Sequence, residues 1–352
     1  MQELLRRLGD PQRAYEAVHV VGTNGKSTTT RMTEALLCAE GLSIGAYLSP
    51  HVRGWSERIR IGCGDADFER AVAHVRRDAE EVGATQFEAV TAAALAAFAA
   101  AGVDAAVVEA GLGGRFDATN VLRSRVVVLT NVGLEHTDVL GGTREEIARE
   151  KLAVVRAGAT VVLGEPEWEA AAREAGAERV VLGSRSNLGL AVTAATEFLG
   201  RPVGPGAAEA VSLPGRLERR SEAPLEIWDG AHNLDGIGYL LGRLPTRSYV
   251  LVASILADKD VGGMLAALAA LGDTLVATSS SNPRALAAAE LARRAEKRFA
   301  HVEAVEEPAR ARERALELAG PDGAVLMTGS LYLLADLSVR FEHVPWPSPA
   351  HA

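Results

Sequence analysis

The sequence lacks the features of several common protein classes. It contains only two cysteines, Cys38 and Cys63, which gives no sign of a disulfide framework and fits a reducing cytoplasm. It has no dense Lys/Arg block, and its formal net charge of −9 argues against a surface for nucleic acid or anionic membranes. The longest apolar stretch, residues 92–103, is too short to span a bilayer, and the polar N-terminus is unlike a signal peptide. We therefore expect a cytoplasmic protein without membrane or nucleic-acid partners.

The length and apolar content of the chain indicate a globular protein with a sizeable hydrophobic core. With 352 residues, we expect two domains or one large α/β unit. Apolar residues make up 48% of the chain, which is enough to form a sizeable core without disulfide or metal staples.

A glycine-bearing turn follows the first apolar run of the sequence. Residues 22–28 read Gly-Thr-Asn-Gly-Lys-Ser-Thr directly after the apolar run 17–21, and a helix-forming stretch comes next. Such a turn directs backbone N–H groups and Lys26 toward a polyphosphate, and Ser27 or Thr28 can place a hydroxyl on Mg²⁺. The alternative is a plain glycine turn with a solvated lysine. The position between strand and helix favours an ATP site.

Short apolar runs alternate with helical patterns along the whole chain, which is typical of parallel sheets covered on both faces. The predicted strands are 17–21, 44–48, 103–109, 125–132, 159–163, 225–228, 248–253, 274–278, 301–305 and 324–327. The predicted helices are 27–40, 67–82, 86–101, 144–156, 234–243, 262–271, 285–298, 309–319 and 331–341. The fold class is therefore α/β.

A change of composition divides the chain into two domains. Residues 201–214 are rich in Gly, Pro and Ala, as in a linker. We expect a P-loop ATP-binding domain over 1–204, a linker over 205–213, a smaller Rossmann-like domain over 214–344 and a loose tail over 345–352.

Ligands of open α/β sheets bind beyond the carboxyl ends of the strands, and Glu109 stands at such an end. A carboxylate after the apolar run 105–108 is costly to leave uncompensated, so a Mg²⁺ ion is one partner for it. The alternative is an ion pair with Arg115.

Three further residues admit a structural or a functional interpretation. His136, which follows a strand, is either a hydrogen-bonded structural residue or a metal ligand. Lys151 lies among glutamates in a predicted helix, and this local pattern indicates a solvated lysine on a charged helix face. Arg216 is either a surface charge or a phosphate-binding fork.

Taken together, the motifs resemble those of the folylpolyglutamate synthase/dihydrofolate synthase family, within the Mur ligase superfamily. The matching segments run in order through nearly the whole chain: 19–26, 49–51, 57–59, 109–120, 130–137, 147–151, 214–218, 229–233, 257–260 and 328–332. The chain departs from the family pattern at Ser27, where a second glycine is usual, and in the segment 165–187, which is much shorter than its counterpart. Its N-terminus also begins late, so we expect a shortened member.

The resemblance implies an ATP-dependent ligase that adds L-glutamate to a folate-type carboxylate, with a P-loop ATPase domain and a smaller Rossmann-like domain. It assigns the ATP phosphates and nucleotide to Thr23, Asn24, Gly25, Lys26, Ser27, Thr28, Asn187, Arg216 and Asp229. It assigns Mg²⁺ to a P-loop hydroxyl, Ser49, Glu109, His136 and a carbamylated Lys151. His232 and Ser330 would position glutamate.

Two alternatives to this function stay open at the level of sequence. One is another Mur-type amino-acid ligase, which shares the mechanism but not the motifs at 49–51 and 57–59. The other is a nucleotide-binding relative without ligase activity. The resemblance also leaves dihydropteroate and tetrahydrofolate as alternative acceptors. We expect only small-molecule partners (ATP, glutamate and the folate or dihydropteroate) and a monomeric protein.

Overall fold

The computed structural model describes residues 1–338, which form two compact units. Unit 1 consists of residues 1–51 and 55–211, and unit 2 consists of residues 52–54 and the described chain from Ser212 onward. The last residues of the predicted helix 331–341, the predicted domain end at 344 and the predicted tail 345–352 lie outside the described residues.

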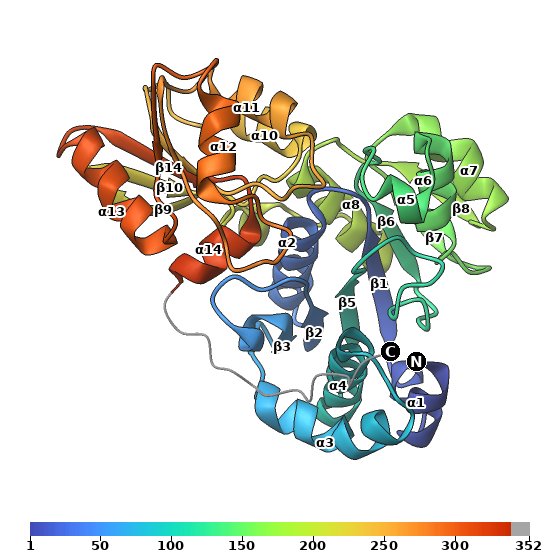
Figure 1. Cartoon of the computed structure of the whole chain (residues 1–352). Coiled ribbons are helices and arrows are strands. Elements are labelled where there is room, and N and C mark those ends of the chain that lie inside the picture. Colours follow the sequence, from blue (N-terminus) through green and yellow to red (C-terminus); the bar gives the residue numbers. More distant parts are fainter. Residues whose placement is uncertain (339–352) are drawn as a thin grey trace. The chain divides into compact units, whose positions relative to one another are not determined.

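Unit 1 is built on an eight-stranded sheet in the order β4-β3-β2-β5-β1-β6-β7-β8 (Figure 1). The strands are β1 (Glu16–Val21), β2 (Ile44–Tyr47), β3 (Ile59–Ile61), β4 (Gly64–Asp65), β5 (Ala105–Glu109), β6 (Val126–Leu129), β7 (Thr160–Leu163) and β8 (Arg179–Leu182). Strands β2, β5, β1, β6 and β7 run parallel, as the buried apolar runs predict, and β8, which was not predicted, adds a further parallel strand at the edge. The antiparallel strands β3 and β4 at one edge were not expected.

Helices cover both faces of this sheet. They are α1 (Gln2–Arg7), α2 (Lys26–Ala39), α3 (Phe68–Glu81), α4 (Gln86–Ala101), α5 (Thr137–Leu140), α6 (Arg144–Leu152), α7 (Glu169–Glu174), α8 (Asn187–Leu199) and α9 (Gly206–Glu209). Helices α2 and α8 lie side by side on one face, where their apolar residues pack on Val18 and Val20 of β1. Helices α3 and α4 pack on the other face over β2 and β5, and α6 and α7 pack there over β6 and β7. Helix α9 lies within the segment that we expect to be a linker.

A disulfide in unit 1 contradicts the expectation that the cysteines stay unpaired. Cys38, near the end of α2, is bonded to Cys63, in the turn between β3 and β4. The same hairpin is held to α2 by Arg60, whose guanidinium pairs with the fully buried Glu34. Because the two cysteines are 25 residues apart and the hairpin has no clear sequence signal, their approach was not visible in the pattern.

Unit 2 has a six-stranded sheet in the order β13-β12-β11-β14-β10-β9. Its strands are β9 (Glu218–Glu222), β10 (Leu225–Trp228), β11 (Val250–Ala253), β12 (Thr274–Ala277), β13 (His301–Ala304) and β14 (Ala324–Thr328). Its helices are α10 (Leu234–Leu241), α11 (Val261–Leu268), α12 (Ala288–Ala295), α13 (Pro308–Ala319) and α14 (Leu331–Leu337). Helices α10, α11 and α12 pack on one face, and α13 and α14 pack on the other.

Five strands of unit 2 are parallel, which confirms the predicted α/β class, and β9 pairs antiparallel with β10 at the edge. Across the described residues of both units, every helix is too short or too polar to traverse a lipid bilayer.

Candidate active site

The phosphate turn joins β1 to α2, as the sequence predicts, and its backbone requires glycine at two positions. Gly22 has a φ of +148°, and a Cβ placed on it would lie 1.9 Å from the Thr130 hydroxyl oxygen. Gly25 has a φ of +80° and directly precedes the 14-residue helix α2, with no side chain capping the helix. The first N–H groups of α2 are thus presented at the turn, where the positive end of the helix dipole favours an anion.

The loop after β6 braces this turn through several hydrogen bonds. The Thr23 N–H donates to the Asn131 carbonyl oxygen at 3.0 Å, and the Asn24 N–H donates to Asn131 Oδ1 at 2.9 Å. The Thr130 hydroxyl donates to the Asn24 carbonyl oxygen at 2.7 Å, and the Thr23 hydroxyl accepts from the Gly133 N–H at 3.0 Å. Sequence reasoning placed no role on Thr130, although the polar pair directly after a buried strand was a signal for one.

Three further predicted nucleotide-binding residues lie on or against the turn. Lys26 Nζ donates to the carbonyl oxygens of Gly22 and Thr23, each at 3.2 Å, so the ammonium folds back over the turn. Asn187, the first residue of α8, packs so closely that a Cβ on Gly25 would lie 2.4 Å from its Oδ1 atom. Thr28 lies half-buried in the first turn of α2.

Glu109 ends β5 next to the turn, and only 2% of its surface is exposed. Its carboxylate accepts from the Ser27 hydroxyl at 2.9 Å and from the Ser49 N–H at 3.1 Å. Arg115, the partner in the alternative interpretation, forms its ion pair with Glu150 instead, at 3.2 Å. A buried carboxylate beside the Ser27 hydroxyl provides oxygen donors of the kind that suit Mg²⁺, so the residues present fit this ion.

Lys151 is buried on α6, so its interpretation as a solvated lysine is wrong. Its side chain is 4% exposed, and Nζ donates to the Gly22 carbonyl oxygen at 2.9 Å. Burial, together with the positive charge of Lys26, lowers the pKa of the Lys151 ammonium to about 7. A lysine next to a phosphate turn is thereby available as the neutral amine near physiological pH.

His136 lies at the end of the loop that follows β6. It has a left-handed backbone with a φ of +52° and directly precedes the short helix α5. Within residues 1–338, His, Cys, Asp and Glu side chains form no group of three that could hold a metal ion. A metal site here would therefore need hydroxyls, ligand oxygens or a modified side chain in addition to Glu109.

Three predicted site residues of unit 2, Asp229, His232 and Ser330, follow β10 or β14, and Arg216 precedes β9. All four bond to backbone groups. The Asp229 carboxylate accepts from the N–H groups of Leu217 and Ala231, each at 2.9 Å, and burial raises its pKa. Ser330, which is 2% exposed, accepts from the Tyr332 N–H at 3.1 Å and so caps α14.

The other two predicted residues of unit 2 also contact nearby carbonyl groups. His232 Nδ1 lies 2.9 Å from the Gly230 carbonyl oxygen, which identifies Nδ1 as the protonated nitrogen because a carbonyl oxygen can only accept. Arg216 Nη1 donates to the Gly215 carbonyl oxygen at 3.1 Å.

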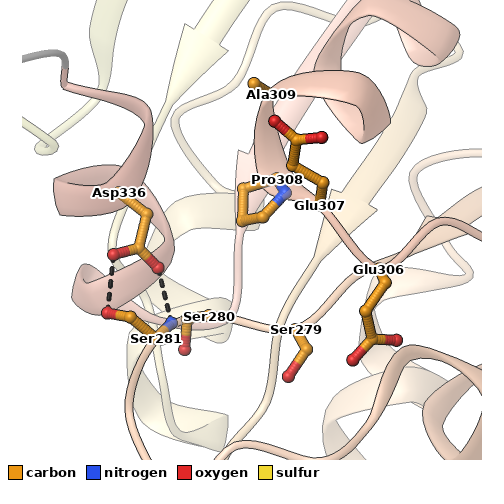
Figure 2. A pocket seen from close by; sticks show the side chains of 8 residues that line it. All are labelled: Ser279, Ser280, Ser281, Glu306, Glu307, Pro308, Ala309 and Asp336. Atoms are coloured by element: carbon orange, nitrogen blue, oxygen red, sulfur yellow. Dashed lines mark hydrogen bonds between the residues drawn. The ribbon is translucent and has the colours of Figure 1, made fainter.

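A separate hollow in unit 2 contains none of the predicted site residues (Figure 2). It lies where the chain leaves β12 and β13, and Asp336 of α14 binds the hydroxyl and N–H of Ser281 at its side. Its lining includes Glu306 and Glu307, a composition that does not suit phosphate.

The fold and the phosphate turn define an ATP-dependent ligase of the Mur class. Residues 20–194 match the Mur ligase middle domain, and residues 215–331 match the Mur ligase glutamate ligase domain.

More specific similarity comes from individual proteins. The dihydrofolate synthase/folylpolyglutamate synthase of Escherichia coli is 32% identical, over 94% of this chain and 87% of that protein. The folylpolyglutamate synthase of Mycobacterium tuberculosis, solved with ADP and AMPPCP, is 31% identical with a TM-score of 0.88, over 96% of this chain and 94% of that one. A bifunctional folylpolyglutamate synthase/dihydrofolate synthase with Mn, AMPPNP and L-glutamate bound is 31% identical with a TM-score of 0.84, over 96% and 92%. The chain belongs to the dihydrofolate synthase/folylpolyglutamate synthase family, which confirms the resemblance.

Proposed function

We propose that this protein is an ATP-dependent ligase that joins L-glutamate through an amide bond to the carboxylate of a folate-type acceptor. The observation that carries the proposal is the contact of the buried Glu109 carboxylate with Ser27 of the phosphate turn and with Ser49. Family membership supports the choice of reaction, since the relatives are folate ligases and have been solved with ADP or ATP analogues.

The phosphate turn and Lys26 hold the ATP phosphates in this proposal. The N–H groups at the start of α2 bind phosphate oxygens, and the Lys26 ammonium, which reaches only turn carbonyls in this structure, moves to the γ-phosphate. Ser27, Ser49 and Glu109 hold Mg²⁺, and Ser27 rather than Thr28 supplies the hydroxyl because Ser27 already contacts Glu109. When bound, Mg²⁺ supplies charge neutralisation for phosphoryl transfer.

Lys151 is carbamylated in the working enzyme. Its neutral amine adds to CO₂ and releases one proton, which leaves a carbamate with two anionic oxygens where the ammonium now donates to Gly22. The pKa of Lys151 near 7 supports this step, because an ammonium has no lone pair to attack CO₂. A carbamate would supply the additional oxygen ligands that a second Mg²⁺ requires, beside the Glu109 carboxylate and a ring nitrogen of His136.

The chain's residues then direct two transfers. The acceptor carboxylate oxygen attacks the γ-phosphorus of ATP, the bond to ADP breaks, and an acyl phosphate forms. The glutamate amine attacks the acyl carbon, loses a proton, and expels inorganic phosphate. The resemblance assigns Arg216, Asp229 and Asn187 to the nucleotide, and His232 and Ser330 to the incoming glutamate.

An ATP-consumption assay tests the function directly. Purified protein with ATP, Mg²⁺ and glutamate is offered dihydropteroate and tetrahydrofolate in separate reactions, and ADP release and the lengthened product are measured. We expect ADP release that needs both glutamate and an acceptor. Nucleotide binding without turnover on either acceptor would favour a relative that has lost ligase activity.

The proposed enzyme is a monomer and acts in the cytoplasm, where ATP and folates are available. The Cys38–Cys63 bond removes the cysteine argument for this location, which therefore depends on the substrates alone. Light scattering of the purified protein tests the oligomeric state, and a mass of about 37 kDa is expected.

A further inference from the structure

A histidine that the proposed mechanism does not use lies at the centre of unit 1. His19 is on β1, the strand that leads into the phosphate turn, and its side chain is fully buried. Its Nε2 atom lies 2.8 Å from the Thr119 hydroxyl oxygen, and its Nδ1 atom has no hydrogen-bond partner in the described structure. A buried polar atom without a partner is costly, so this arrangement calls for an explanation.

The hydrogen bonds around Thr119 determine which ring nitrogen of His19 carries the proton. The Thr119 hydroxyl donates its single hydrogen to Asp117 Oδ1, so its oxygen can only accept from His19. His19 is therefore the neutral Nε2–H tautomer. Protonation would place a second N–H, at Nδ1, in a buried position without an acceptor. Burial lowers the pKa of His19 to about 4. The negative charge of Asp117 raises this pKa, and the positive charge of Arg156 lowers it.

This series of hydrogen bonds ends at Asp117, which accepts from backbone N–H groups of its own loop. Asp117 Oδ2 accepts from the Leu112 N–H at 2.8 Å, and Asp117 Oδ1 also accepts from the Thr119 N–H at 2.9 Å. The two ends of the loop formed by residues 111–120 are thus tied together and to β1 through His19. The hydrogen bonds all run in one direction: the His19 ring N–H donates to the Thr119 hydroxyl, which donates to the Asp117 carboxylate.

The middle of the loop 111–120 lies against the helix that carries Lys151. A Cβ on Gly114 would be 2.5 Å from the Lys151 carbonyl oxygen, and the Arg115 N–H donates to the Glu150 carbonyl oxygen at 3.1 Å. The loop begins two residues after Glu109. It therefore connects one candidate metal ligand to α6, the helix that carries another candidate ligand, Lys151.

The loop 111–120 also exposes two large apolar side chains. Phe116 is 89% exposed and Leu112 is 43% exposed, although Ala118 and Thr119 of the same loop are buried. The aromatic rings of a folate-type acceptor have apolar surface to bury, and glutamate does not. The nucleotide is assigned to the phosphate turn, Asn187, Arg216 and Asp229, none of which belongs to this loop. This favours the acceptor as the substrate that contacts the loop.

We infer that His19 is a positioning residue for the acceptor: its Nε2–H aligns the Thr119 hydroxyl and the Asp117 carboxylate, which hold the loop 111–120 in its binding conformation. This inference rests on the proposed function, since it takes the acceptor to be a folate-type carboxylate. His19 contacts no reacting atom and transfers no proton in this role.

Two matched pairs of variants test the inference. Thr119→Val removes the hydroxyl at constant shape, and Thr119→Ser keeps it. His19→Gln keeps an N–H donor near the Nε2 position, and His19→Asn moves it to the Nδ1 position. For each variant, kcat and the KM values for acceptor, ATP and glutamate are measured, together with deuterium exchange at the Leu112 amide.

We expect Thr119→Val and His19→Asn to raise the acceptor KM by roughly tenfold or more, the effect of one buried hydrogen bond left unmade. The KM values for ATP and glutamate should stay within about twofold of wild type, since the phosphate turn is held by separate hydrogen bonds from Thr130 and Asn131. Thr119→Ser and His19→Gln should restore the acceptor KM to within about threefold, and the Leu112 amide should exchange faster only in the first two variants.

Equal acceptor KM values for Thr119→Val and Thr119→Ser, or a parallel rise of all three KM values, would overturn the inference while the ligase function stands. An inactive wild-type protein would overturn the proposed function and this inference with it. If Thr119→Val fails to fold, the His19→Gln and His19→Asn pair decides by the same comparison.

Discussion

The two units of this protein use similar parallel sheets but hold their candidate site residues in different ways. In unit 1, functional groups contact one another or the phosphate turn: Ser27 binds Glu109, and Lys151 binds Gly22. In unit 2, Asp229 binds backbone N–H groups of its own loop and of the loop before β9, and Ser330 binds the Tyr332 N–H at the start of α14. In the proposed mechanism, the phosphate and metal chemistry is therefore centred on unit 1, whereas the predicted site residues of unit 2 mainly order the backbone of loops.

This difference predicts two classes of mutational effect. A substitution in unit 1 removes charge or a metal ligand and should lower the rate steeply at small cost in stability. A substitution in unit 2 removes a cap or a turn and should lower stability and affinity by similar small amounts. The following predictions test this contrast, from the largest effect to the smallest.

Replacing Lys26 with alanine should have the largest effect. Without the ammonium, charge on the transferring phosphoryl group is not stabilised, and we expect kcat to fall by roughly 10³-fold or more. ADP release measures this, and the melting temperature should stay near that of wild type. Lys297→Ala, at an exposed position in unit 2, is the matched control and should be fully active. More than a tenth of normal activity in Lys26→Ala would refute the role.

Glu109→Gln should lower kcat by roughly 10²- to 10³-fold and raise the Mg²⁺ concentration needed for half-maximal rate, because the amide lacks the anionic charge that binds the ion. A magnesium titration of ADP release measures both effects. Glu222→Gln, at a position whose side chain is 73% exposed, serves as control. An unchanged magnesium requirement in Glu109→Gln would remove Glu109 from the metal site.

Lys151→Ala should lose most of its activity, though less than Lys26→Ala does, and should partly recover when short carboxylic acids are added. The small carboxylate occupies the space left by the carbamate and returns an anionic oxygen ligand to the site. Activity is measured against the concentration of formate or acetate, with Lys26→Ala as the control that no acid rescues. Full activity of Lys151→Ala without any added acid would contradict the carbamate.

Lys151→Met should stabilise the protein most at low pH, in buffer without divalent cations or CO₂. The pKa of Lys151 is about 7 in the folded state and near 10.5 when unfolded. Between these values the unfolded chain binds the extra proton, so the wild type gains stability as pH rises and carries the full cost of the buried charge below pH 7.

The advantage of Lys151→Met should therefore shrink by on the order of 2–3 kcal/mol between pH 6 and pH 9. Urea unfolding of both proteins at the two pH values measures it. A constant difference between the two proteins would show that Lys151 keeps an ordinary pKa.

Ser330→Ala should have the smallest effect of the five substitutions. It removes the cap on α14, which costs about 1 kcal/mol of stability, and it should raise the glutamate KM by less than about tenfold. Thermal unfolding and a glutamate titration measure the two changes. A loss of kcat as large as that of Lys26→Ala would erase the contrast between the units.

Much of the fold could be predicted from the sequence because buried parallel strands and amphipathic helices leave strong local patterns. The strand 225–228 and the helix 86–101 have the predicted bounds. The strands β3, β4, β8 and β9, at or next to the sheet edges, were missed because they are short and mostly polar or partly exposed, so no long apolar run marks them. The Cys38–Cys63 bond depends on the position of one such hairpin, so it was missed too.

The candidate site likewise contains residues that a local sequence pattern reveals and residues whose surroundings depend on distant contacts. Glu109 could be found because a carboxylate that ends an apolar run is locally unusual. Lys151 was assigned only through the family resemblance, since its neighbours in sequence are charged and only the packing of α6 buries it. The bracing by Thr130 and the chain from His19 to Asp117 join residues about 100 positions apart, and no local pattern encodes such contacts.

The most direct test of the account follows an oxygen atom. The acceptor is prepared with ¹⁸O in its reacting carboxylate and incubated with the protein, ATP, Mg²⁺ and glutamate, and the released phosphate is analysed by mass spectrometry. If the acceptor is activated as an acyl phosphate, each phosphate released with product carries one ¹⁸O atom. Phosphate without ¹⁸O, formed while ATP is consumed, would contradict the proposed ligase mechanism.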